Sequence, residues 1–96
     1  MKIKTKYNIG EIVLFKNPKT NDVDVGKIDK VYISFSWEEL LKQEYMIIPI
    51  RMRAVYVSDW VRVDKMEIHK RLDKKAFKKA YAEQCAKEII NEINND

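Results

Sequence analysis

Two side chains in this sequence are of the types that act as a general base or a nucleophile, and each occurs once. His69 is the single histidine and Cys85 the single cysteine. They fall on different predicted elements, although nucleophile and base must lie within hydrogen-bonding reach. A zinc site would need about four ligands, mostly Cys and His, and the two glycines, Gly10 and Gly26, form no phosphate loop. The sequence therefore predicts no enzyme, no metal site and no cofactor.

The strongest charge signal is a short basic segment that reads HKRLDKKAFKKA over residues 69–80. Residues 70–79 hold six basic side chains and one acidic one, a net charge of +5 against +4 for the whole chain. Such density is typical of a surface that contacts phosphates. The alternative is a solvated helix face that only keeps the protein soluble. The basic residues are Lys70, Arg71, Lys74, Lys75, Lys78 and Lys79.

Length and composition are those of one small globular domain. Of 96 residues, 46% are hydrophobic and 35% charged, which is enough for a modest single core. No apolar run approaches the roughly 18 residues of a membrane span, and the start MKIKTKYNIG lacks the apolar stretch of a secretory signal. One cysteine makes no intrachain disulfide, so we expect a cytoplasmic protein with no membrane partner.

The residue pattern predicts β structure followed by one helix. Runs of β-branched and aromatic residues separated by turn formers predict five short strands within residues 9–69. Pro49 divides the long run 44–57 into two strands or bends one strand sharply, and residues 36–43 predict a loop with one helical turn. Asp73 is a predicted N-cap for a helix that ends near Asn94. We therefore divide the single domain into a β part, residues 1–69, and a helical part, residues 70–96.

Four segments of the β part resemble small SH3-like barrels of the Tudor and KOW kind: YNIGEIVLFKN, VGKIDKVYI, YMIIPI and WVRVDKMEI. The resemblance covers residues 6–69. It implies a five-stranded antiparallel barrel, followed here by a long amphipathic helix, and a binding module of the sort found in proteins of phages and mobile elements. Such barrels commonly open with an aromatic-x-hydrophobic-Gly-acidic-x-Val motif, matched by Tyr7, Ile9, Gly10, Glu11 and Val13.

The predicted helix has two apolar faces, which follow from its rotation of about 100° per residue. One face lies opposite the basic residues and should pack on the β part: Leu72, Ala76, Phe77 and Ala80. After Tyr81 the apolar residues rotate onto the half that is basic upstream: Cys85, Ala86, Ile89, Ile90 and Ile93. This second face predicts an antiparallel homodimer in which lysines 74, 75 and 78 approach glutamates 83, 88 and 92 of the partner. The alternative is a helix that bends near Tyr81 and wraps its own barrel.

Alternation along residues 50–57 and 60–63 predicts a second patch on the barrel. If the intervening residues point into the core, Arg51, Arg53, Trp60 and Arg62 point outward on one side. Arginine with an aromatic ring suits stacking on bases and contact with phosphates, and it suits a protein hot spot equally well. In the alternative interpretation, Trp60 folds back over the barrel end.

Together these patterns predict a non-enzymatic binding module. The favoured ligand is nucleic acid, bound through the basic helix face and the patch of arginine and tryptophan. The alternative is a small accessory protein of the phage or mobile-element type that binds and modulates a host protein, for example as an inhibitor of a defence system.

Overall fold

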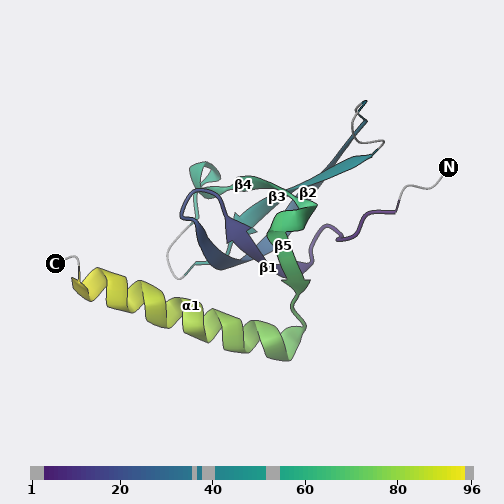
Figure 1. Cartoon of the computed structure of the whole chain (residues 1–96). Helices are drawn as coiled ribbons and strands as arrows, with labels where there is room; N and C mark the ends of the chain where they lie inside the picture. The colour runs from purple at the N-terminus through teal and green to yellow at the C-terminus, as the bar shows by residue number, and fades with distance from the viewer. Residues whose placement is uncertain (1–3, 36, 38–40, 52–54, 95–96) are drawn as a thin grey trace.

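The computed structural model describes residues 4–35, 37, 41–51 and 55–94 and shows an antiparallel sheet with one long helix beside it (Figure 1). The sheet has five strands in the order β4-β3-β2-β1-β5. Two 3-10 turns, η1 (Val57–Asp59) and η2 (Lys65–Glu67), precede β4 and β5. The regular elements are β1 (Ile12–Asn17), β2 (Asp22–Ser34), β3 (Lys42–Pro49), β4 (Val61–Asp64), β5 (Ile68–Arg71) and α1 (Lys74–Asn94).

β2 is the longest strand and joins the two halves of the sheet. It pairs with β1 over Asp22–Lys27 and with β3 over Gly26–Ser34. A register shift between Ile28 and Lys30 marks a bulge, and a bulge bends a strand and increases its twist. β4 and β5 form the two edges of an open sheet. The strand pairing therefore does not close the barrel predicted from the sequence.

The inner face of the sheet carries the core, and Tyr7 ties the segment before β1 to it. The Tyr7 and Tyr45 rings meet edge to face with centroids 5.5 Å apart, and the Tyr7 N–H donates to the Tyr45 hydroxyl at 3.2 Å. The Tyr7 hydroxyl donates to the carbonyl of Ile68 at 3.4 Å. These contacts join β3, β5 and the N-terminal segment. The core residues are Tyr7, Val13, Phe15, Ile28, Tyr45, Ile47, Val61, Val63 and Ile68.

The residues of the opening motif have distinct positions. Val13 is buried in the core, and Gly10 has a φ of +91°, a left-handed conformation that glycine adopts without strain. The Gly10 N–H donates to the Ile28 carbonyl at 2.8 Å. Ile9, the hydrophobic residue of the motif, is 68% exposed and therefore lies outside the core.

Gly26 is required by close packing. The bulge lies between Ile28 and Lys30, whereas Gly26 sits opposite Val13 in the ladder. A Cβ atom at Gly26 would lie 2.3 Å from Ile47 Cγ2 and 2.7 Å from Phe15 Cε1. The core therefore leaves no space for any side chain at this position.

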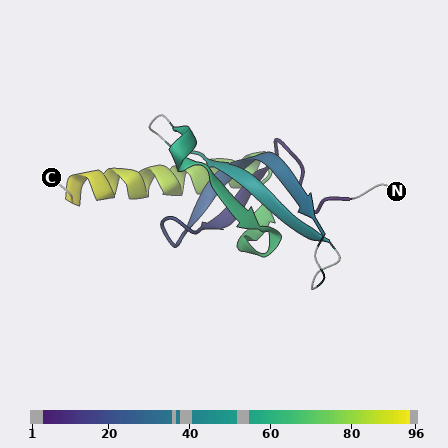
Figure 2. The same ribbon diagram turned by 90° about the horizontal axis from the view of Figure 1, so that it is seen from above.

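α1 begins at its predicted cap. The Asp73 carboxylate accepts a hydrogen bond from the Ala76 N–H at 2.7 Å, and the Asp73 carbonyl accepts from the Phe77 N–H at 2.8 Å. The helix then covers the outer face of β1 and β2, where Leu14 and Val25 are directly paired. Val25 is 2% exposed although it lies outside the inner core cluster. In Figure 2 the C-terminal half of α1 projects past the sheet.

The boundary between the β part and the helix differs from the prediction. The sheet continues past His69, because Lys70 pairs with Leu14 and Arg71 pairs with Val13. Lys70 and Arg71 are therefore residues of β5 and not of the helix.

Two further elements of the structure differ from the prediction. The strand predicted over 50–57 is not formed there, because β3 ends at Pro49 and Val57 begins η1, while residues 52–54 lie outside the described residues. The loop predicted over 36–43 is shorter, because Lys42 and Gln43 belong to β3. Residues 36 and 38–40, where its helical turn was expected, also lie outside the described residues.

We predict that Gly26→Ala destabilises the protein by about 1–3 kcal/mol, the usual cost of overpacking a core. The matched control is Lys27→Ala, the neighbouring exposed position. Urea denaturation followed by circular dichroism measures both free energies of unfolding. A Gly26→Ala protein as stable as the control would contradict the packing described here.

Candidate functional site

The outward side of α1 is an exposed charged surface. Residues on the side facing the sheet are half-buried or buried, with Gln84 at 8% exposure. The lysines of the first turns lie on the opposite side and are all exposed, and none forms an ion pair with a carboxylate among the described residues. This lysine face consists of Lys74, Lys75, Lys78 and Lys79.

Lys70 extends the lysine face from the helix to the sheet. A cleft of about 220 Å³ lies between β1, β5 and α1. Apolar side chains, among them Leu14 and Ala80, line it together with the charged residues Lys70, Lys79 and Glu83. Lys70 of β5 and Lys79 of α1 therefore border one cleft.

Arg71, predicted as part of the basic helix face, is exposed but neutralised by a carboxylate of its own chain. Its guanidinium forms an ion pair with Glu11 and donates to the carbonyl of Lys6. It also lies over the Tyr7 ring, 4.9 Å from the centroid. Arg71 therefore fastens β5 to the N-terminal segment and contributes little free positive charge.

The predicted patch of arginine and tryptophan is not assembled as expected. β4 pairs with β3 over Glu44–Ile47 and not with residues 50–57. Arg62 lies over the Tyr32 ring at 4.0 Å and forms an ion pair with Glu44 at 3.2 Å. Trp60 is half-buried, and its carbonyl accepts a hydrogen bond from the Lys19 ammonium at 3.0 Å.

Arg51 points into the fold and not outward. It lines a cleft different from the one that Arg62 lines, so the structure does not bring these two arginines to one side. The prediction of an outward Arg51 was wrong because the chain leaves β3 at Pro49 and the strand alternation ends there. Arg53 lies outside the described residues.

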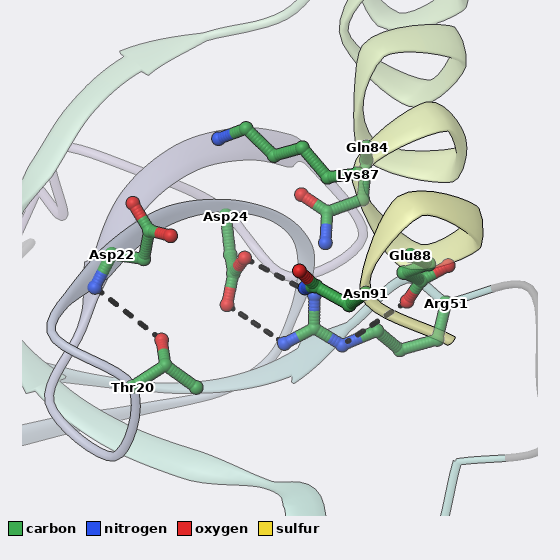
Figure 3. A pocket seen from close by; sticks show the side chains of 8 residues that line it. All are labelled: Thr20, Asp22, Asp24, Arg51, Gln84, Lys87, Glu88 and Asn91. Atoms are coloured by element: carbon green, nitrogen blue, oxygen red, sulfur yellow. Dashed lines mark hydrogen bonds and ion pairs between the residues drawn. The ribbon is translucent and has the colours of Figure 1, made fainter. Parts of the chain in front are cut away.

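Figure 3 shows the polar cleft around Arg51, which has a volume of about 260 Å³. The guanidinium binds both oxygens of Asp24, at 3.1 and 2.8 Å, and their side chains are 13% and 6% exposed. Asn17 also donates to Asp24 at 2.9 Å. The Glu88 carboxylate of α1 lies 3.8 Å from Arg51 Nε. Arg51 therefore links β2 to the C-terminal half of α1.

The electrostatics keep Arg51 charged. Burial acts to lower the pKa of Arg51, but the hydrogen bonds and charge of Asp24 outweigh it, with help from Glu88 and Asp59, so the pKa is raised above its ordinary value. The raised pKa means that the stabilisation from this charge is fully present at neutral pH and is lost only as pH rises through that higher value. Its donors serve internal carboxylates, so Arg51 acts as a structural contact between the sheet and the helix.

The residues considered for catalysis or metal binding are not brought together. His69 is exposed on β5 and Cys85 is half-buried on α1. Among the described residues, no three His, Cys, Asp or Glu side chains form a group that could hold a metal ion. No helix in the described part of the chain is long and apolar enough to cross a membrane.

Two exposed apolar surfaces complete the candidate sites. The first is the second apolar face predicted for the helix, where Ile89, Ile90 and Ile93 are 46%, 55% and 66% exposed. The second surface was missed. It lies where the β2–β3 hairpin extends beyond β4, with Phe35 at 70% and Trp37 at 105% exposure. Ile33 and Phe35 continue at alternate positions from the core-packed Val31, a signal that could have been read from the sequence.

Comparisons with known proteins find no match to a family model, to a curated protein or to a solved structure. Functional inference therefore depends on the surfaces of this chain alone.

We predict that Arg51→Met costs about 3–5 kcal/mol of unfolding free energy, because it leaves the buried Asp24 carboxylate unpaired. Arg62→Met, which breaks the more exposed pair with Glu44, should cost at most about 1 kcal/mol. Denaturant titration measures both values. The double variant Arg51→Met/Asp24→Asn should recover part of the loss, because no unpaired charge remains buried. Equal, small effects of Arg51→Met and Arg62→Met would contradict the linking role of Arg51.

Proposed function

We propose that this chain is a non-catalytic binding module for nucleic acid and that the lysine face of α1 contacts the phosphates. The observation that carries the proposal is the group of four exposed lysines without carboxylate partners among the described residues. Lys70 adds a cation across the neighbouring cleft. Phosphate contacts of this kind supply affinity without reading sequence.

The placement of the lysines is costly for the isolated protein, which supports an external anion. Lys74 with Lys78, and Lys75 with Lys79, are like-charged pairs one turn apart, each destabilising by roughly 0.2–0.5 kcal/mol. Lys74 and Lys75 also lie in the first turn of α1, at the positive end of the helix dipole, where cations are unfavourable by about 0.3–1 kcal/mol each. A phosphate backbone would relieve both costs and gain from the release of its counterions.

We further propose that this open sheet is a variant of the SH3-like barrels of the Tudor and KOW kind, the scaffold of a binding module. Three features support this. β2 is shared between two sets of partners and bulged in its middle. The turn η2 separates β4 from β5, which returns to pair with β1. The motif residues Tyr7, Gly10 and Val13 hold core or turn positions.

A second candidate function is that of a small accessory protein, of the phage or mobile-element type, that binds and modulates a host protein. The exposed Phe35 and Trp37 at the end of the β2–β3 hairpin favour it, because exposed aromatic side chains are enriched at protein interfaces. This candidate predicts a complex that survives nuclease and moderate salt in a pull-down. Phe35→Ser/Trp37→Ser should abolish that complex, and Tyr56→Ser/Val57→Ser, which alters two other exposed apolar residues, should retain it.

The main proposal predicts a steep dependence of nucleic-acid binding on salt. Gel-shift titrations with mixed DNA and RNA at two salt concentrations measure it. Replacing the four lysines of the lysine face by glutamine should weaken binding at low salt roughly tenfold or more and lower the slope of log K against log[salt] by about 3 to 4 for duplex DNA.

The matched control replaces four exposed lysines elsewhere with the same loss of charge: Lys4, Lys16, Lys27 and Lys30. Its binding should fall much less. Absence of wild-type binding at low salt would reject the proposal, and so would an equal loss in both quadruple variants.

A further inference from the structure

Downstream of the lysine face, the outward side of α1 becomes apolar. The same side that presents lysines in the first turns presents Ile89, Ile90 and Ile93, all exposed, together with the exposed Ala82 and Ala86. We name these five residues the isoleucine face. α1 is one continuous helix from Lys74 to Asn94, so the bend near Tyr81 that would have wrapped it around its own sheet is not adopted.

The sheet of the same chain does not cover the isoleucine face, because α1 packs on the sheet through its other side. Glu88 faces Arg51 at 3.8 Å, and Gln84 is buried on the same side. Turning the helix to bury the isoleucines would move both residues away from the sheet. Three exposed isoleucines within two turns of a helix indicate contact with another molecule.

The shape of the face suits another helix. Ala82 and Ala86 lie one turn apart, upstream of the isoleucines on the same side. Small residues let two helices approach near the lower end of the usual 8–10 Å interaxial range. The larger Ile89 and Ile90 could then insert over the alanines of a facing helix.

The charges select the direction of that helix. On the side of the isoleucine face, exposed cations lie upstream of the alanines and the exposed Glu92 lies downstream, beside Ile93. The exposed Lys87 lines the Arg51 cleft instead. An antiparallel partner of the same sequence would bring Lys78 of each copy near Glu92 of the other, whereas a parallel partner would set lysine against lysine. Antiparallel pairing also opposes the two helix dipoles favourably. A second copy of this chain therefore fits both the shape and the charge of the face.

We propose that the protein forms an isologous dimer in which two α1 helices pack antiparallel through the isoleucine face, with the two-fold axis close to Ala86. In this arrangement Ile89 and Ile90 pack on Ala82 and Ala86 of the second copy. It corrects the pairing predicted from sequence, because Glu88 faces its own Arg51 and takes no part. Lys74 and Lys75 lie at the two ends of the helix pair and remain exposed.

Light scattering coupled to size-exclusion chromatography tests the dimer without any nucleic acid, so its outcome is independent of the proposed function. The wild type should have twice the mass of the 11.5 kDa chain, and Ile89→Asp/Ile93→Asp should halve that mass. The matched control, Ile9→Asp/Val57→Asp, changes two other exposed apolar residues and should remain dimeric. A wild type that stays monomeric at millimolar concentration overturns the proposal, as does a control that dissociates like the α1 variant.

A cysteine cross-link tests the position of the axis. In a Cys85→Ser background, Ala86→Cys should oxidise readily to a covalent dimer, because two residues at the axis come within disulfide distance. Lys75→Cys in the same background should stay monomeric on oxidation, because antiparallel pairing sends its two copies to opposite ends. Cross-linking that is faster at position 75 than at position 86 overturns this geometry.

Discussion

The arginine at position 51 determines how the helix sits on the sheet. Its guanidinium binds Asp24 of β2 through two hydrogen bonds and reaches Glu88 of α1, so one side chain connects the sheet to the far half of the helix. At the other end, Asp73 caps the helix directly after β5. With both ends held, the rotation of α1 about its own axis is set, and that rotation decides which side chains meet solvent.

This orientation explains why both candidate surfaces lie on the same side of one helix. The side toward the sheet carries Phe77, Tyr81, Gln84 and Glu88, all half-buried or buried. The outward side carries lysines in its first turns and isoleucines in its last turns. The lysines lack carboxylate partners among the described residues, while Arg62 and Arg71 each have one and Arg51 has two. The lysine face therefore carries free positive charge, and the arginines stabilise the fold.

Local patterns were sufficient to predict much of this arrangement. Most of the β-rich runs, the Asp73 cap and the helix end near Asn94 depend on neighbouring residues and were confirmed, with the run 50–57 as the exception. The position of Ile89, Ile90 and Ile93 on a second side of the helix, away from Phe77, was also predicted, because a helix wheel needs only the rotation per residue.

The errors involve contacts between distant residues. No residue near Arg51 in the sequence indicates that its partner is Asp24, which precedes it by 27 positions. Without that pair, Arg51 was predicted to point outward. Lys70 and Arg71 were assigned to the helix because their strand pairing with β1 depends on the returning chain. The exposed hairpin end was missed because its exposure depends on how far β4 extends along β3.

The most direct test of the central claim, that the outward side of α1 is the ligand surface, is residue-by-residue mapping of amide chemical shifts. The ¹⁵N-labelled protein would be titrated with a short oligonucleotide at low salt. The account predicts shifts concentrated at Lys70 and over Lys74–Lys79, with the amides of Asp24 and Arg51 unchanged. Shifts centred on the β2–β3 hairpin near Phe35, with the lysine face unchanged, would contradict it.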